Sequence, residues 1–195
     1  MKKLIALLSL SCLLQGCIFV VGAAAGAAAI AMVYDHRPVE DTIADTKLAN
    51  KISDKIFANR KLKEESHIDV TVFNRIVLLT GETPNQEWHD QAEEIAKSFS
   101  DVSRVYNQIT IQGPTSSLTR TSDSWISTKI KTQLLAHEEL KTNTSSIKVV
   151  TESGVVYLMG EVTHQQADIA VDVAREVSGV QKVIKIFQYT NANPA

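Results

Sequence analysis

The sequence predicts an α+β protein in which one small αββαβ unit occurs twice after an N-terminal targeting segment. Three observations predict it: an apolar stretch behind two lysines at the start, a long stretch that recurs at an offset of 79, and apolar spacing that changes from helical to alternating within each copy. The composition, with 44% hydrophobic and 22% charged residues and a net charge of −2, is that of a globular protein. It excludes disordered and collagen-like classes, and no basic patch supports nucleic-acid binding.

The start of the chain has the pattern of a bacterial lipoprotein signal peptide, predicted over residues 1–16. Two lysines precede the apolar residues 4–14, which are too few to span a bilayer. The following Leu-Gln-Gly-Cys resembles a lipobox, which implies cleavage before Cys17 and the attachment of an S-diacylglycerol and an N-acyl chain to it. Ile18 stands where an aspartate would signal inner-membrane retention, so the resemblance favours the outer membrane. The alternative is a cysteine that follows a signal sequence by chance.

A lipidated tether and linker is predicted over residues 17–45. Residues 18–33 are uncharged and rich in Ala and Gly, but these 16 residues are fewer than the roughly 18–20 that a membrane span needs. The alternative is one continuous membrane anchor over residues 4–33. Cys12 leaves with the signal peptide, so the mature chain has no disulfide and no cysteine metal site.

The rest of the chain is an internal duplication. Residues 68–81 align without a gap with residues 147–160, and apolar positions upstream and valines downstream repeat in the same order. A repeat of this length predicts two tandem domains, at 46–112 and 124–190, rather than a solenoid. The Gly-, Pro-, Ser- and Thr-rich residues 113–123 are predicted to be a linker.

Each copy is expected to form a three-stranded sheet packed on two helices. Apolar residues at intervals of four predict the first helix, at Leu48, Ile52 and Ile56 in the first copy. Two β-rich runs around a short polar segment then predict a hairpin, and an Ala-rich helix and a last strand follow. The expected strands are 68–73, 76–80 and 104–111 in the first copy and 147–151, 155–159 and 181–189 in the second.

The second copy resembles a known family. Its run 155–162 (VVYLMGEV), the Ala-rich helix and the segment 177–183 with Gly179 resemble the BON domain. A lipobox followed by two such domains resembles the dual-BON outer-membrane lipoproteins of Gram-negative bacteria. The resemblance implies binding of anionic phospholipid and a role in envelope integrity, under stress and at the division site.

The first copy departs from this pattern at two turns. Arg75 stands where the second copy has Gly154, and Asp101 stands where it has Gly179. Both glycines are expected in turns that need a positive φ or little volume. The corresponding turns of the first copy are therefore expected to differ.

Nothing in the sequence indicates an enzyme. The five histidines form no ligand-spaced pair, adjacent acidic residues diverge on a helix, and nucleophile and phosphate-binding motifs are absent. Gly81 and Gly160 are interpreted as turn residues after strands. We expect no metal and no cofactor besides the lipid on Cys17.

Trp125 is the candidate for membrane contact. A helix capped by Ser122 or Asp123 would place it about 140° from the buried stripe, and the first copy has Lys47 there. Tryptophan suits the headgroup boundary, where lysines and helix amides can meet phosphates. The alternative is that Trp125 packs between the two domains. The predicted phospholipid-binding residues are Ser122, Asp123, Ser124, Trp125, Thr128, Lys129, Lys131 and Thr132.

Charge favours the second copy as the lipid-facing one. Residues 35–112 carry 10 basic and 14 acidic side chains, whereas residues 113–195 carry 8 of each. Trp88, among acidic neighbours, is expected to have a structural or partner role. The sequence thus predicts a non-enzymatic, outer-membrane lipoprotein facing the periplasm that binds anionic phospholipid membranes. The alternative is an adaptor for proteins of envelope assembly, division or the cell wall.

Overall fold

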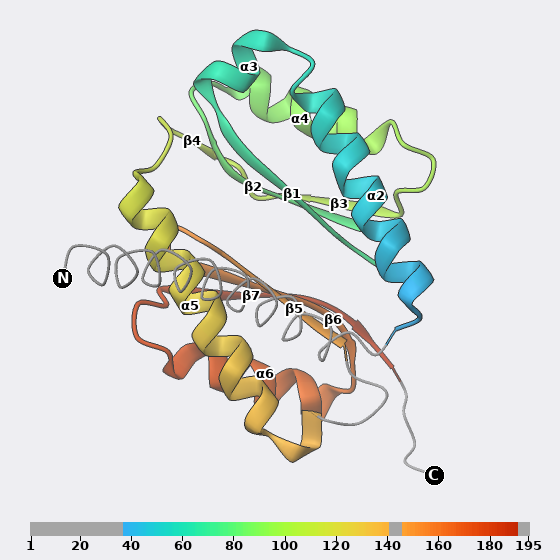
Figure 1. Cartoon of the computed structure of the whole chain (residues 1–195), viewed down its shortest axis with the longest axis vertical. Coiled ribbons are helices and arrows are strands. Elements are labelled where there is room, and N and C mark those ends of the chain that lie inside the picture. The colour runs from blue at the N-terminus through green and yellow to red at the C-terminus, as the bar shows by residue number, and fades with distance from the viewer. Residues whose placement is uncertain (1–36, 141–145, 191–195) are drawn as a thin grey trace, which may run out of the picture.

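The computed structural model describes residues 37–140 and 146–190 (Figure 1). The predicted signal peptide, the lipobox with Cys17 and most of the predicted tether lie outside the described residues.

The first copy folds as predicted, with one added helix and a divided last strand. Strand β2 pairs antiparallel with β1 and parallel with β3 and β4. The elements are α2 (Val39–Ile56), α3 (Arg60–Glu65), β1 (His67–Phe73), β2 (Ile76–Thr83), α4 (Gln86–Lys97), β3 (Arg104–Asn107) and β4 (Thr110–Ile111).

The second copy repeats this topology, and the predicted αββαβ order is confirmed in both. Strand β6 pairs antiparallel with β5 and parallel with β7. The elements are α5 (Ser117–Ala136), the short 3₁₀ helix η1 (Glu138–Leu140), β5 (Ser146–Glu152), β6 (Val155–Val162), α6 (His164–Glu176) and β7 (Lys182–Tyr189).

Each domain has its own core between its helices and one face of its sheet. The apolar stripes of α2 and α5 are buried as their spacing predicts. Trp88 of α4 lies in the first core at 9% exposure, which confirms a structural role. Because each core is built from helices and strands of one copy, the described residues form two domains, and α5 is the first helix of the second.

The two sheets also pack face to face, so the molecule has four layers with helices on both outer sides (Figure 1). A third apolar cluster fills the contact, and strand β2 is buried along its whole length because both of its faces are covered. The buried residues of this cluster are Phe73, Ile76 and Leu78 from the first domain and Tyr157, Met159 and Ile186 from the second. This packing orients the second domain against the first.

Helix α5 begins earlier than the sequence predicted. Ser116 is its N-cap and accepts a hydrogen bond from the Thr119 amide, so the expected caps at Ser122 or Asp123 were wrong. Serine and threonine usually favour caps and turns because they compete for backbone groups. Here hydroxyls inside the helix donate to the carbonyl four residues earlier, as Ser124 does, and the helix continues through them.

The β1–β2 and β5–β6 turns have the same conformation, contrary to the expected difference. Asn74 and Arg75 have φ of 48° and 63°, and Ser153 and Gly154 have φ of 50° and 75°. Arg75 takes the left-handed conformation without being glycine, and its guanidinium donates to the carbonyl of Asp101. At the second turn the copies do differ, because Gly179 has φ of 93° and Asp101 has no positive φ.

Gly81 and Gly160 lie inside strands β2 and β6 and are not the turn residues that the sequence suggested. A Cβ on Gly160 would lie 2.4 Å from the Ser146 carbonyl oxygen, and one on Gly81 would lie 2.0 Å from the His67 carbonyl oxygen. Glycine is required in both strands because the partner backbone comes too close for a side chain.

Candidate functional site

An exposed stripe runs along α5 on the side away from the core. Trp125 is 55% exposed, and Leu118, seven residues earlier, is 80% exposed. At 100° per residue, the directions of these two side chains around the helix axis differ by about 20°. We define the α5 stripe by its exposed members Leu118, Ser122, Trp125, Lys129 and Thr132. Trp125 is therefore not packed between the domains.

Leu118 was missed by sequence reasoning because it falls in the predicted linker. Its spacing of seven from Trp125 was the available signal, but it has meaning only once residues 117–123 are helical. Together Leu118 and Trp125 give the stripe two large apolar side chains that make no core contact.

The other predicted lipid-binding residues lie on the side of α5 that lines a cleft between the domains. Ser124 and Thr128 are exposed beside the stripe, although their hydroxyls already donate to backbone carbonyls at 3.0 and 2.9 Å. Asp123 is only 5% exposed and Lys131 is partly buried, where burial lowers its pKa. All four residues, Asp123, Ser124, Thr128 and Lys131, line this cleft.

Asp123 ties α5 to the β5–β6 turn. Its two carboxylate oxygens accept hydrogen bonds from the amides of Ser153 at 2.8 Å and Gly154 at 2.9 Å. Asp45, 78 residues earlier in the sequence, binds the amides of the β1–β2 turn at 2.7 and 3.1 Å. Because the same pair of hydrogen bonds occurs in both copies, we infer a structural role for Asp123.

The cleft has a volume of about 460 Å³ and is lined by both domains. Charged and hydroxyl side chains make up most of its lining, so it does not resemble an apolar ligand pocket. It lies between β1 of the first domain and α5 and β5 of the second. The lining residues are His67, Asp69, Arg120, Asp123, Ser124, Ser127, Thr128, Lys131, Val149, Val150, Thr151 and Glu152.

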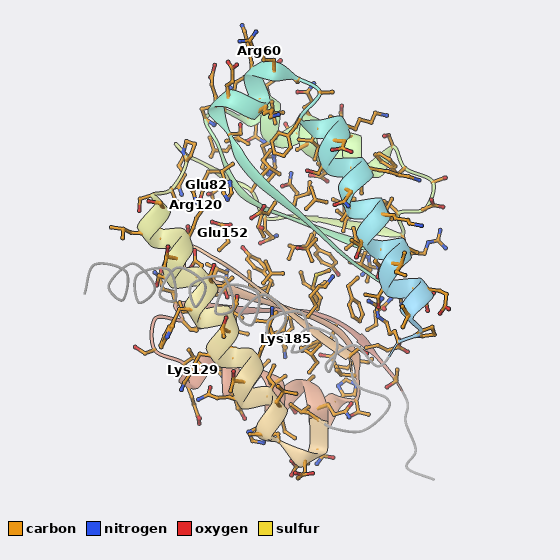
Figure 2. The ribbon with its side chains drawn as sticks, viewed as in Figure 1. Arg60, Glu82, Arg120, Lys129, Glu152 and Lys185 are labelled. Atoms are coloured by element: carbon orange, nitrogen blue, oxygen red, sulfur yellow. The ribbon has the colours of Figure 1, made fainter. Side chains whose placement is uncertain are left out.

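Buried carboxylates gather at this end of the interface, where Figure 2 shows Glu82, Glu152 and Arg120. Glu82 is fully buried and accepts hydrogen bonds from the amide and hydroxyl of Thr115. Glu152 is 9% exposed, and burial, together with the charges of Glu82, Asp123 and Asp69, raises its pKa to about 7. Sequence reasoning missed this cluster because its members are far apart along the chain.

Comparison with known proteins defines the class. The BON domain family matches residues 44–113 and 122–191. The chain is 36% identical over 97% of its length to the outer membrane lipoprotein DolP of Haemophilus influenzae, covering 96% of that protein. It is 38% identical over 80% of its length to the 21 kDa hemolysin of Actinobacillus pleuropneumoniae, covering 82% of that protein. The chain therefore belongs to the BON domain family.

These relationships confirm three predictions. The family resemblance and the α+β fold with two BON domains are confirmed, and so is the outer-membrane lipoprotein class with its location. These relatives are named as a lipoprotein and a hemolysin rather than as members of an enzyme family. Within residues 37–140 and 146–190, every helix is too short or too polar to cross a membrane.

Proposed function

We propose that this lipoprotein binds anionic phospholipid through the α5 stripe of its second BON domain, without catalysing a reaction. The observation that carries the proposal is Trp125, a large aromatic side chain held 55% exposed on a helix whose opposite face is buried. Lys129 lies on the same side and can meet lipid phosphates. Leu118 extends the apolar surface toward the helix N-terminus.

The energetics favour a shallow contact rather than insertion. Burying one large apolar side chain contributes roughly 1.5–3 kcal/mol, and a lysine near an anionic surface adds about 1 kcal/mol. The α5 stripe alone would therefore bind membranes weakly and reversibly. The acyl chains expected on Cys17 would hold the protein at the membrane, so the stripe would decide the orientation of the domains and the lipids they meet.

The lipid on Cys17 would bind any vesicle by itself, so the test uses an unlipidated form that starts at residue 37 and contains both complete domains. It is sedimented with phosphatidylglycerol vesicles and with phosphatidylcholine vesicles. Trp125→Glu is expected to lower the affinity for phosphatidylglycerol about 10- to 150-fold, which corresponds to the loss of 1.5–3 kcal/mol.

The matched control is Ile43→Glu, which places the same charge on an exposed apolar position of α2 in the first domain. It should leave sedimentation unchanged. Unchanged sedimentation of Trp125→Glu would refute the lipid site. In that case, loss of binding to an envelope-assembly, division or cell-wall protein in the same variant would support the adaptor function instead.

We further propose that this binding supports envelope integrity and acts at the division site. The support is membership of the BON family and the similarity to DolP over almost the whole chain. A strain that carries Trp125→Glu should then be more sensitive to detergents than one that carries Ile43→Glu.

A further inference from the structure

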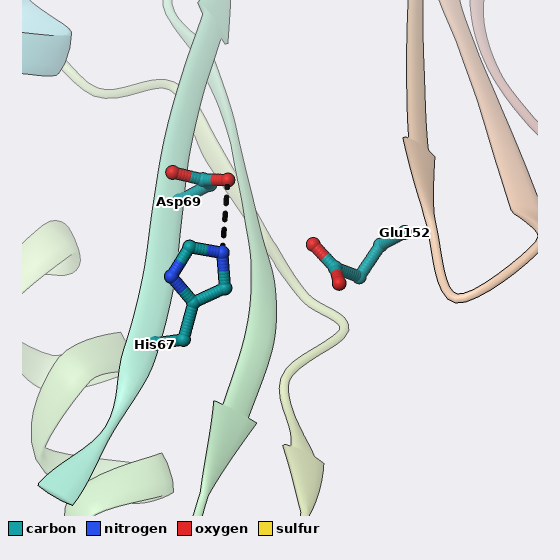
Figure 3. A group of neighbouring side chains, drawn as sticks. All are labelled: His67, Asp69 and Glu152. Atoms are coloured by element: carbon teal, nitrogen blue, oxygen red, sulfur yellow. Dashed lines mark ion pairs between the residues drawn. The ribbon is translucent and has the colours of Figure 1, made fainter. Parts of the chain in front are cut away.

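We propose that the cleft between the two domains holds a divalent transition-metal ion, with His67, Asp69 and Glu152 as its ligands. This inference is independent of the lipid-binding proposal. Figure 3 shows the carboxylate of Glu152, from the second domain, directed toward the two side chains on β1 of the first domain.

The strand register brings the first two ligands together. His67 and Asp69 are two residues apart on β1, so their side chains lie on the same face of the sheet, the one that faces the second domain. The His67 Nε2 and Asp69 Oδ2 atoms are 3.6 Å apart. Glu152 ends strand β5 and approaches them across the interface.

The distances suit a small cation. One ligand atom from each of the three residues lies within 4.8 Å of the other two. Ligands of tetrahedral zinc, with bonds of 2.0–2.1 Å, are roughly 3.4 Å apart. The two β1 ligands are already at that separation. Glu152 has to approach by at most about 1.4 Å, which side-chain rotation can supply.

The burial of Glu152 and the lack of a donor to one of its oxygens indicate a ligand, independently of this spacing. Glu152 is only 9% exposed, and no N–H or O–H group among the described residues donates to its Oε1 atom. A buried carboxylate oxygen without a donor is unfavourable by several kcal/mol unless a cation or proton satisfies it. Glu152 is aimed at the imidazole and the second carboxylate, where a metal ion would satisfy it.

The surrounding charges also favour a cation. Four carboxylates, of Asp69, Glu82, Asp123 and Glu152, act together at this end of the interface. The cationic side chains that line the cleft are Arg120 and Lys131. Asp69 is 63% exposed and gives an ion a route from solvent.

The donor set selects the class of metal. One imidazole nitrogen with two carboxylates suits zinc and similar first-row ions, whereas calcium and magnesium prefer all-oxygen ligands. Three protein ligands leave a position for water. Because the ligands come from both domains, the ion would fasten the domains together at the end where α5 is tied to the β5–β6 turn.

The test titrates Zn²⁺ into the full lipidated protein, purified in detergent and stripped of metal, by isothermal titration calorimetry. One Zn²⁺ per chain is expected, with a higher midpoint of thermal unfolding. Glu152→Gln and His67→Ala should each weaken binding at least tenfold, with circular dichroism showing that both variants remain folded. An excess of Ca²⁺ should not displace Zn²⁺.

The matched control is His89→Ala. His89 and Asp90 form a similar pair, with Nδ1 and Oδ1 2.8 Å apart, but no third potential ligand among the described residues completes a metal-binding group with them. This variant should bind Zn²⁺ like the original protein. Absence of saturable binding, unchanged affinity in Glu152→Gln and His67→Ala, or an equal loss in His89→Ala would overturn the site. Displacement by Ca²⁺ would overturn the choice of a transition metal.

Discussion

Replacement of Glu152 by glutamine should stabilise the protein at alkaline pH and remove part of its pH dependence. In the folded protein, burial and the charges of Glu82, Asp123 and Asp69 raise the pKa of Glu152 from 4.5 to about 7. The folded state therefore binds more protons than the unfolded state between these two values. The free energy of unfolding falls as pH rises through this window, and the loss is complete above pH 7.

The size of the effect follows from the shift. Each pKa unit corresponds to 1.36 kcal/mol, so the charged form of Glu152 costs at most about 3 kcal/mol at pH 8. The open side of the cleft screens part of this cost, which leaves about 1–3 kcal/mol. Glutamine has nearly the same shape as glutamate and does not ionise. We therefore expect Glu152→Gln to be more stable than the original protein by this amount at pH 8, and by less than about 1 kcal/mol at pH 5.

The assay is urea unfolding at pH 5, 6, 7 and 8, with a chelator present so that no metal ion contributes. Glu176→Gln, which neutralises an exposed carboxylate on α6, serves as the control and should show no such trend. A stability difference between Glu152→Gln and the original protein that is the same at pH 5 and pH 8 would refute the reasoning.

Three further predictions concern the architecture. Gly160→Ala should lower the free energy of unfolding by more than about 1 kcal/mol, measured in urea, since its Cβ would lie 2.4 Å from a backbone oxygen of β5; normal stability would contradict the close approach. Leu78→Ala should cost about 2–5 kcal/mol and, because Leu78 belongs to the cluster between the sheets, split the calorimetric transition in two; one unchanged transition would show that the domains are not coupled there. Asp123→Ala should cost roughly 2–4 kcal/mol in urea unfolding, because two turn amides lose their acceptor; a loss below 0.5 kcal/mol would show that the turn holds without the tie.

The elements of the fold could be predicted wherever one local pattern decided them. Ile126, Ile130 and Leu134 are spaced for one helix face, and all three are buried in the core of the second domain. The start of α5 could not be predicted in this way. Serine and threonine are common at helix ends, and only the backbone carbonyls around them decide that they continue a helix.

Only part of the candidate lipid site could be predicted from the sequence. The exposure of Trp125 followed from its angle on the helix, whereas Leu118 became visible only with the helix extended to Ser117. Asp123, Ser124, Thr128 and Lys131 were assigned to lipid but line the cleft, because a one-dimensional pattern does not show where the other domain packs.

By itself the sequence determined the duplication, the order of helices and strands in each copy and the side of α5 that faces away from the core, because these depend on spacing within one segment. Only the tertiary structure decided that the two sheets pack face to face and that His67 meets Glu152, 85 residues later. The physical reason is that strand alternation marks which side chains share a face and does not say what covers it. The apolar face of each sheet that its own helices leave uncovered is buried against the other sheet, and that packing also brings Asp69 of β1 and Glu152 of β5 together.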